Sequence, residues 1–142
     1  MRFFLDECLN VKVDAPLKAW LTKDEFLRSG LPTIPYGMND IELIQELAKL
    51  EVDAVFTSDL KQMNSPDRIR ERQAYRAQNI HWVGVPQSFV KGRARPYVQA
   101  ANLLSAVHFV RSELAAAEKP LAIELKTGFR KVDDPVSKLF DI

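Results

Sequence analysis

Short apolar runs alternate along this chain with segments that carry apolar residues at helical spacing. The runs at 2–6 (RFFLD), 53–57 (DAVFT) and 80–85 (IHWVGV) have the length and the side chains of buried strands. Buried strands that are separated by helices pair in parallel, because each connection must cross a face of the sheet. The alternation therefore predicts an α/β domain of three layers, with a central, mainly parallel sheet flanked by helices.

The other elements follow from start and stop signals in the sequence. We expect a first helix between Asp14 and Gly30, and then a short strand at 31–36, where two prolines limit pairing. Asn39 opens a capping box before a second amphipathic helix. Residues 1–127 form a single domain in this interpretation, and 128–142 form a C-terminal tail. Three further elements complete the prediction: an arginine-rich helix at 65–78, a long helix at 97–118 and a strand at 121–125.

Size and composition are those of an ordinary globular domain. A chain of 142 residues can bury about two-thirds of the surface that its unfolded state exposes. Apolar residues make up 46% and charged residues 27%, which argues against intrinsic disorder. No apolar run approaches the roughly 20 residues of a membrane span, and acids interrupt the start of the chain, where a secretory signal needs an apolar core. The single cysteine, Cys8, cannot form an internal disulfide, so we expect a cytoplasmic protein without membrane contact.

The net charge of +1 hides an uneven distribution. Residues 1–60 carry six basic and eleven acidic side chains, whereas residues 61–95 carry eight basic and two acidic ones. Carboxylates that gather in space can hold a divalent cation, and a basic flank can hold a polyanion. The same distribution is also typical of solvated helix faces.

Three acids lie where parallel sheets bind ligands, beyond the carboxyl ends of the strands. Asp6 ends the first predicted strand, Asp59 follows the DAVFT strand, and Asp40 begins a helix. Each acid also has a structural interpretation. Asp6 could be a partly buried charge, Asp59 a turn residue and Asp40 a helix cap, although Asn39 is an equally good cap. Gathered carboxylates repel one another unless a cation lies among them. Oxygen ligands favour Mg²⁺ or Mn²⁺, and such an ion can activate a water molecule for attack on phosphorus.

The opening RFFLDECL, the segment NDIELIQELAKL and the strand-turn VFTSD resemble the PIN-like nuclease domain. The resemblance is closest to its compact branch, which includes toxins of bacterial toxin–antitoxin pairs. In that family an acid ends the first strand, a second acid opens a helix before an apolar strand, and a third follows that strand in a Thr-x-Asp turn. These places fall on Asp6, Asp40 and Asp59, and the match covers roughly residues 1–86.

The resemblance implies a three-layer PIN-like fold and an endoribonuclease that depends on Mg²⁺ or Mn²⁺ and cuts RNA phosphodiester bonds with water. It also implies a cognate antitoxin as partner and allows a homodimer. Asp6, Asp40 and Asp59 would hold the metal and carry catalysis. Thr57 and Ser58 would support them by hydrogen bonding to a carboxylate or to a water on the metal.

One acid of the larger PIN domains has no obvious counterpart here. It lies on a helix between the first strand and the second acid, where this chain offers Asp14, Asp24 and Glu25. Glu7 is our preferred substitute as a fourth catalytic acid, and Asp67 is the runner-up. If neither reaches the metal, the site binds its ion weakly until a substrate phosphate completes the shell.

Basic residues follow the predicted acid cluster along the chain. Arg68, Arg72 and Arg76 are spaced by four, which places them on one face of the predicted helix. The planar guanidinium group donates two parallel hydrogen bonds to phosphate, so RNA laid across the strand ends could contact this face. An arginine-rich helix is also typical of a merely solvated surface. The predicted RNA-binding residues are Lys61, Arg68, Arg72, Arg76, Lys91, Arg93 and Arg95.

Two other functions remain open. A non-catalytic module on a nuclease fold would bind RNA or a protein without cutting, and a chelator would not affect its binding. A phospho-transfer domain also places an acid at a strand end. A phosphatase of that kind needs Asp-x-Asp where this chain has Asp6-Glu7-Cys8, and a receiver needs a lysine after a later strand, which Val85-Pro86 lacks.

Overall fold

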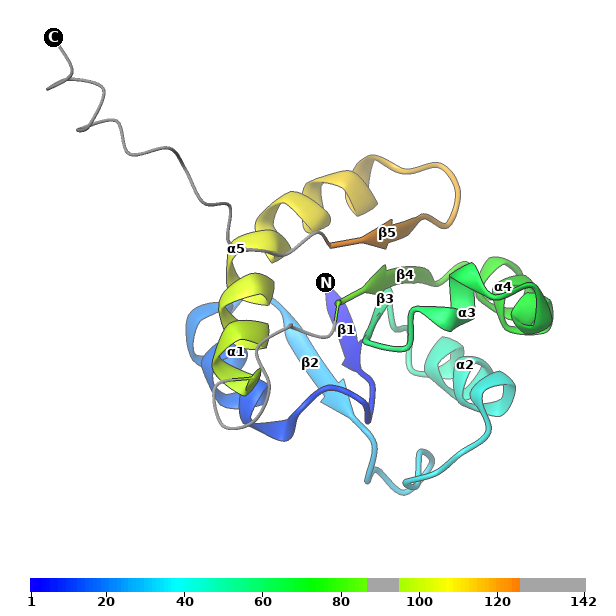
Figure 1. Ribbon diagram of the computed structural model, residues 1–142, viewed down its shortest axis with the longest axis horizontal. Helices are drawn as coiled ribbons and strands as arrows, with labels where there is room; N and C mark the ends of the chain where they lie inside the picture. The colour runs from blue at the N-terminus through cyan, green and yellow to red at the C-terminus, as the bar shows by residue number, and fades with distance from the viewer. Residues whose placement is uncertain (87–94, 126–142) are drawn as a thin grey trace, which may run out of the picture.

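The computed structural model describes residues 1–86 and 95–125, and the side chain of Arg95 lies outside the description. Within this part of the chain, five strands form one sheet in the order β2-β1-β3-β4-β5 (Figure 1). Every neighbouring pair of strands runs parallel, which confirms the predicted α/β class. The strands are β1 (Arg2–Leu5), β2 (Glu25–Arg28), β3 (Ala54–Thr57), β4 (His81–Gly84) and β5 (Ala122–Glu124).

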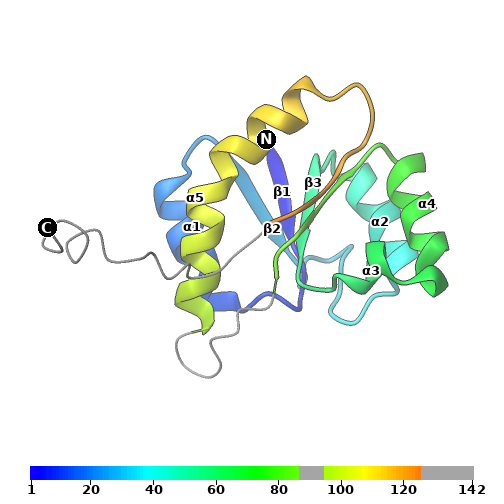
Figure 2. The same ribbon diagram turned by 45° about the horizontal axis from the view of Figure 1, so that its top comes forward.

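Helices cover both faces of this sheet, so that the fold has three layers (Figure 2). One layer holds the 3₁₀ helix η1 (Val11–Val13), α1 (Asp14–Trp20) and α5 (Arg95–Ala116). The other holds α2 (Asp40–Lys49), α3 (Lys61–Asn64), the 3₁₀ helix η2 (Pro66–Arg68) and α4 (Ile69–Ala77). Among the described residues, no helix combines the length and the apolar character needed to cross a bilayer.

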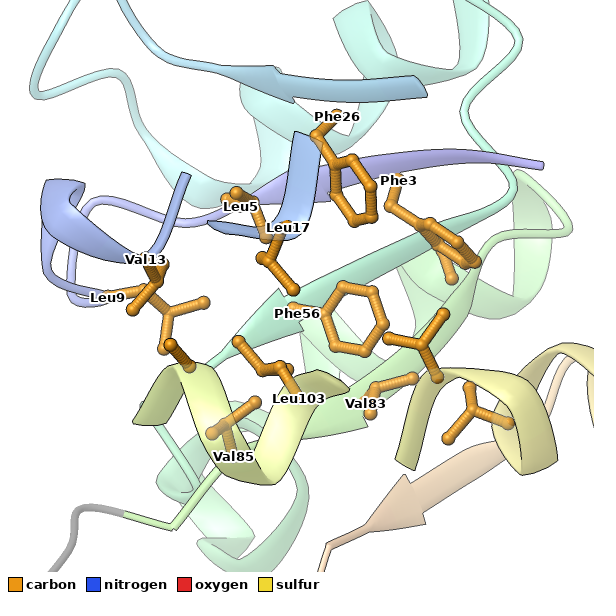
Figure 3. Packing of buried hydrophobic residues seen from close by; sticks show 14 of the residues in the cluster. Phe3, Leu5, Leu9, Val13, Leu17, Phe26, Phe56, Val83, Val85 and Leu103 are labelled. Atoms are coloured by element: carbon orange, nitrogen blue, oxygen red, sulfur yellow. The ribbon is translucent and has the colours of Figure 1, made fainter. Parts of the chain in front are cut away.

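The strands are apolar throughout because both faces of the sheet are buried. Successive strand residues point to opposite faces. Phe3 and Phe56 therefore pack with Leu17 of α1 and Leu103 of α5 (Figure 3), whereas Phe4 packs in the second cluster, on the α2 side. This two-sided burial is the reason that short apolar runs identified β1, β3 and β4 in the sequence.

Two predicted elements are wrong. The first helix ends at Trp20 rather than near Gly30, and residues 25–28 form β2 beside β1. The strand predicted at 31–36 does not form, and only an isolated bridge joins Leu31 to Ile34. Leu27 lies at helical spacing from Leu17, Trp20 and Leu21 in the sequence. However, pairing with β1 offers this segment a ladder of backbone hydrogen bonds, and such tertiary pairing outweighs local propensity. The predicted tail at 128–142 lies outside the described residues.

A histidine joins the last strand to the sheet. His81 Nδ1 accepts a hydrogen bond from the backbone N–H of Leu121, at 2.9 Å, just before β5. Burial lowers the pKa of His81 from its ordinary value of 6.5, and the nearby Asp53 carboxylate opposes this shift. A protonated Nδ1 could not accept the bond, so the junction requires the neutral imidazole.

We therefore expect stability to depend on pH through this residue. The pKa of His81 is lowered in the folded state, so the junction stabilises the fold fully above about pH 6.5, where the imidazole is neutral in both states. This stabilisation is lost as the pH falls through the lower folded-state pKa. Urea unfolding at several values between about pH 7 and pH 5 measures the slope of the free energy of unfolding against pH. His81→Asn keeps an acceptor without titrating, so it should flatten the slope, whereas His108→Gln, on the exposed side of α5, should not. Equal slopes in all three proteins would refute the assignment.

Candidate functional site

The carboxyl ends of β1 and β3 meet at the point where the strand order changes direction. The chain passes from β1 to β2 on one side and returns to β3 on the other. In doubly wound sheets, ligands bind at such a switch point. Asp6 follows β1 directly, and its N–H donates to the carbonyl oxygen of Phe56 at 3.0 Å. Asp59 lies two residues beyond the end of β3, so both acids flank the switch point.

The carboxylate of Asp6 is held between the ends of these two strands. Its Oδ2 accepts the hydroxyl of Thr57 at 2.7 Å, and its Oδ1 accepts the N–H of Glu7 at 2.8 Å. The Thr57 hydroxyl oxygen in turn accepts the N–H of Asp59 at 3.0 Å. Thr57 is fully buried, so this hydroxyl links the two acid-bearing turns at the base of the site.

Asp59 and two further acids converge on one cation at the same edge. Arg68 Nη2 lies 3.2 Å from Asp40 Oδ2, 3.0 Å from Asp59 Oδ2 and 2.6 Å from Glu71 Oε2. Its Nε also pairs with Glu71. We call these four side chains, Asp40, Asp59, Glu71 and Arg68, the Arg68 cluster.

Asp40 can face the cluster because its neighbour caps the helix. Asn39 Oδ1 accepts the N–H of Ile41 at 3.0 Å, which leaves the carboxylate of Asp40 free at the start of α2. Partial burial raises the pKa of Asp40, and the other acids at this edge, above all Glu71, raise it further against the opposing charge of Arg68. The carboxylates are thus close enough to repel one another.

Glu71 is absent from the residues predicted from the sequence. It lies in the first turn of α4, three residues after Arg68, and this spacing is the only local signal that could have selected it. The predicted fourth acid, Glu7, instead braces a loop, since its Oε1 accepts the N–H of Gly37 at 2.7 Å. The runner-up, Asp67, is exposed. The structure therefore places Glu71 beside Asp40 and Asp59 through their common contact with Arg68.

Arg28 of β2 holds the segment that follows Asp6. Its Nη1 donates to the carbonyl oxygens of Asp6 and Leu9, at 3.1 and 2.8 Å, and its Nη2 donates to that of Asn10 at 3.2 Å. The same guanidinium group pairs with the carboxylate of Asp14 through Nη2 and Nε, at 2.6 and 2.8 Å. Asp14 therefore supports the turn after β1 and does not join the acids at the switch point.

A pocket of about 650 Å³ opens beside Asp59. Lys61, exposed at the start of α3, lines it. Ser58 lines it too, is only 7% exposed, and its Oγ has no hydrogen-bond partner among the described residues. Burial and the charge of Asp6 raise the pKa of the Cys8 thiol at its edge, which keeps the sulfur protonated and a poor nucleophile. The pocket is lined by Cys8, Ser58, Asp59, Leu60, Lys61 and Pro86.

The predicted RNA-binding residues fall into different environments. Arg68 precedes α4 and belongs to the Arg68 cluster. Arg72 Nη1 donates to three carbonyl oxygens around the end of α3, so both guanidinium groups make intramolecular contacts. Lys61 and Arg76 are exposed. Lys91 and Arg93 lie outside the described residues, as does the side chain of Arg95.

The donor atoms at the switch point are carboxylate and hydroxyl oxygens, which suit a hard divalent cation. Within residues 1–86 and 95–125, however, no three His, Cys, Asp or Glu side chains are positioned as ligands of a common metal ion. The positive charge among Asp40, Asp59 and Glu71 comes from the guanidinium group of Arg68. The chemistry of the donors thus fits Mg²⁺ or Mn²⁺, and their arrangement is organised around an internal cation.

Comparison with known proteins does not identify a family. No family model matches the sequence, and no curated protein matches it. The three-layer architecture with five parallel strands is consistent with a PIN-like arrangement. Membership of that family stays a prediction, which rests on the three sequence motifs and the placement of their acids.

Proposed function

We propose that this protein is a metal-dependent endoribonuclease that hydrolyses RNA phosphodiester bonds at the carboxyl edge of its sheet. The observation that carries the proposal is the gathering of carboxylates at the switch point between β1 and β3. One cation, Arg68, is shared by Asp40, Asp59 and Glu71. Beside partial burial, the negative charge of Asp6 is among the causes that raise the pKa of Asp40. Four acids at one edge are more than a fold needs there, because each adds repulsion.

The acids would hold Mg²⁺ or Mn²⁺, which when bound supplies activation of water and stabilisation of charge on the phosphate. The remaining work belongs to the residues of the chain. Thr57 orients the carboxylate of Asp6 and ties it to the turn that bears Asp59. Lys61, at the pocket beside Asp59, would position a phosphate group by its charge.

The PIN-like resemblance extends the proposal to a biological role. The protein would be the toxin of a toxin–antitoxin pair, with RNA as its substrate, a cognate antitoxin as its partner and a homodimer as a possible assembly. Support for this role comes from the motifs RFFLDECL, NDIELIQELAKL and VFTSD.

A cleavage assay tests the activity. Wild type and an Asp6→Asn/Asp59→Asn double variant are incubated with a mixed RNA pool in Mg²⁺, in Mn²⁺ and in EDTA, after circular dichroism has shown that both are folded. We expect cleavage by wild type with either metal, and none in EDTA or with the double variant. Cleavage that survives EDTA or the double substitution would refute the proposal. A protein gel of the same preparation reveals any partner that masks the site.

A non-catalytic binding module is the second candidate. It is favoured by Arg68, which already neutralises part of the charge, and by the lack of a three-ligand metal group in the described part of the chain. It predicts RNA binding in fluorescence anisotropy that neither EDTA nor the double substitution changes, without cleavage in any buffer.

A further inference from the structure

We propose that Arg68 is an internal counter-ion that competes with a divalent cation for Asp40, Asp59 and Glu71, and must leave them before the ion binds. The inference deepens the proposed function, and it rests on that function for the role that the ion has in catalysis. Its test, however, measures ion binding rather than RNA cleavage.

The first argument is an imbalance of charge. Nη2 of Arg68 faces carboxylate oxygens of Asp40, Asp59 and Glu71 within 3.2 Å, and Nε also donates to Glu71. Each acid thus has a hydrogen bond to the guanidinium group, but one positive charge faces three negative charges. The excess negative charge is what a doubly charged ion would neutralise more completely.

The second argument comes from the adjoining pocket. Ser58 is 7% exposed, and its Oγ has no hydrogen-bond partner in the described part of the chain, although the residue lies next to Asp59 and lines the same pocket. Buried hydroxyl groups are normally paired, so the buried and unpaired Oγ of Ser58 would gain a partner if a movement of Arg68 admitted a hydrated ion or a phosphate beside Asp59.

The third argument is that Arg68 can leave without disrupting the fold. Its side chain is 25% exposed, and among the described contacts its guanidinium group donates only to carboxylates. Arg28 differs in both respects, since its side chain is 12% exposed and it bonds three backbone carbonyl oxygens. The contacts of Arg68 are thus suited to exchange, whereas those of Arg28 are suited to hold the chain.

Titration calorimetry with Mn²⁺ tests the proposal on the purified full chain. Arg68→Gln removes the competing charge, and we expect it to bind Mn²⁺ at least roughly tenfold more tightly than wild type. Arg70→Gln is the matched control, because Arg70 is exposed and its loss removes the same charge from the chain. It should bind like wild type. Adding Asp59→Asn to Arg68→Gln should cancel the gain and so locate the ion.

A second measurement covers the case in which Arg68→Gln fails to fold. Arg68→Lys keeps the positive charge but replaces the planar guanidinium fork, which bonds Glu71 through two nitrogens, with a flexible ammonium group, so it should bind Mn²⁺ more tightly than wild type. Equal Mn²⁺ affinity in wild type and in the folded Arg68 variants would overturn the proposal, as would their failure to bind Mn²⁺.

The two proposals fail separately in these experiments. If Arg68→Gln binds Mn²⁺ more tightly but neither it nor wild type cleaves RNA, the competition is supported and the nuclease proposal is refuted. If wild type cleaves RNA with metal but Arg68→Gln binds Mn²⁺ no more tightly than wild type, the nuclease proposal is supported and the competition is refuted.

Discussion

An Asp6→Asn variant is expected to lose RNA cleavage by at least roughly 100-fold, because it deletes a negative charge at the switch point and leaves the shape of the side chain unchanged. Asp6 is the only one of the four acids that joins the ends of β1 and β3 through hydrogen bonds, within the described residues. Its charge also raises the pKa of Asp40, which lies at the start of α2. Cleavage rates in saturating Mn²⁺ measure the loss.

The same substitution should leave the fold intact. The asparagine side chain keeps an oxygen that can accept the N–H of Glu7. The Thr57 hydroxyl, which now donates to Asp6, can donate instead to the sulfur of Cys8, 3.2 Å away. We therefore expect the free energy of unfolding to change by less than about 1 kcal/mol in urea.

Asp67→Asn provides the control for this prediction. Asp67 is an exposed acid in η2, and its loss changes the net charge of the protein by the same amount. It should keep the activity of wild type. An Asp6→Asn protein that cleaves RNA at the wild-type rate with ample metal would exclude Asp6 from the site.

A Gln62→Leu variant is expected to lose about 3 kcal/mol of stability, which is a melting temperature lower by roughly 10 °C for a chain of this size. Gln62 lies in α3 and is 2% exposed. Its Oε1 accepts Trp82 Nε1 at 3.0 Å and the Tyr75 hydroxyl at 3.3 Å. Burial raises the pKa of Tyr75 well above its ordinary value, so the hydroxyl stays protonated and needs an acceptor.

The physical reason is that leucine would bury two donors without partners. Each unpaired buried donor costs about 1–3 kcal/mol. Tyr75→Phe removes one of these donors, so it should cost less in the Gln62→Leu background than in wild type. Gln73→Leu, on the exposed side of α4, is the control and should change stability by less than about 0.5 kcal/mol. Additive effects of Gln62→Leu and Tyr75→Phe would contradict the shared acceptor.

The sequence was most informative where one local feature decided the structure. The apolar runs at 2–6, 53–57 and 80–85 form β1, β3 and β4 to within two residues, because strands buried on both faces must be apolar throughout. The capping signal at Asn39 correctly left Asp40 free at the start of α2. The order of these elements also predicted that Asp6 and Asp59 would lie at one edge of a parallel sheet.

Other features depended on residues far apart in the chain. The segment at 25–28 became a strand because β1 was available for pairing, which no local spacing could indicate. Glu71 joined Asp40 and Asp59, and Arg68 entered the acid cluster, because α2, the turn after β3 and the start of α4 meet in space. The sequence by itself thus determined the strands other than β2, the fold class and the edge at which the acids lie. Only the tertiary structure decided which charges face each other there, because electrostatic contacts depend on distance in space rather than on separation along the chain.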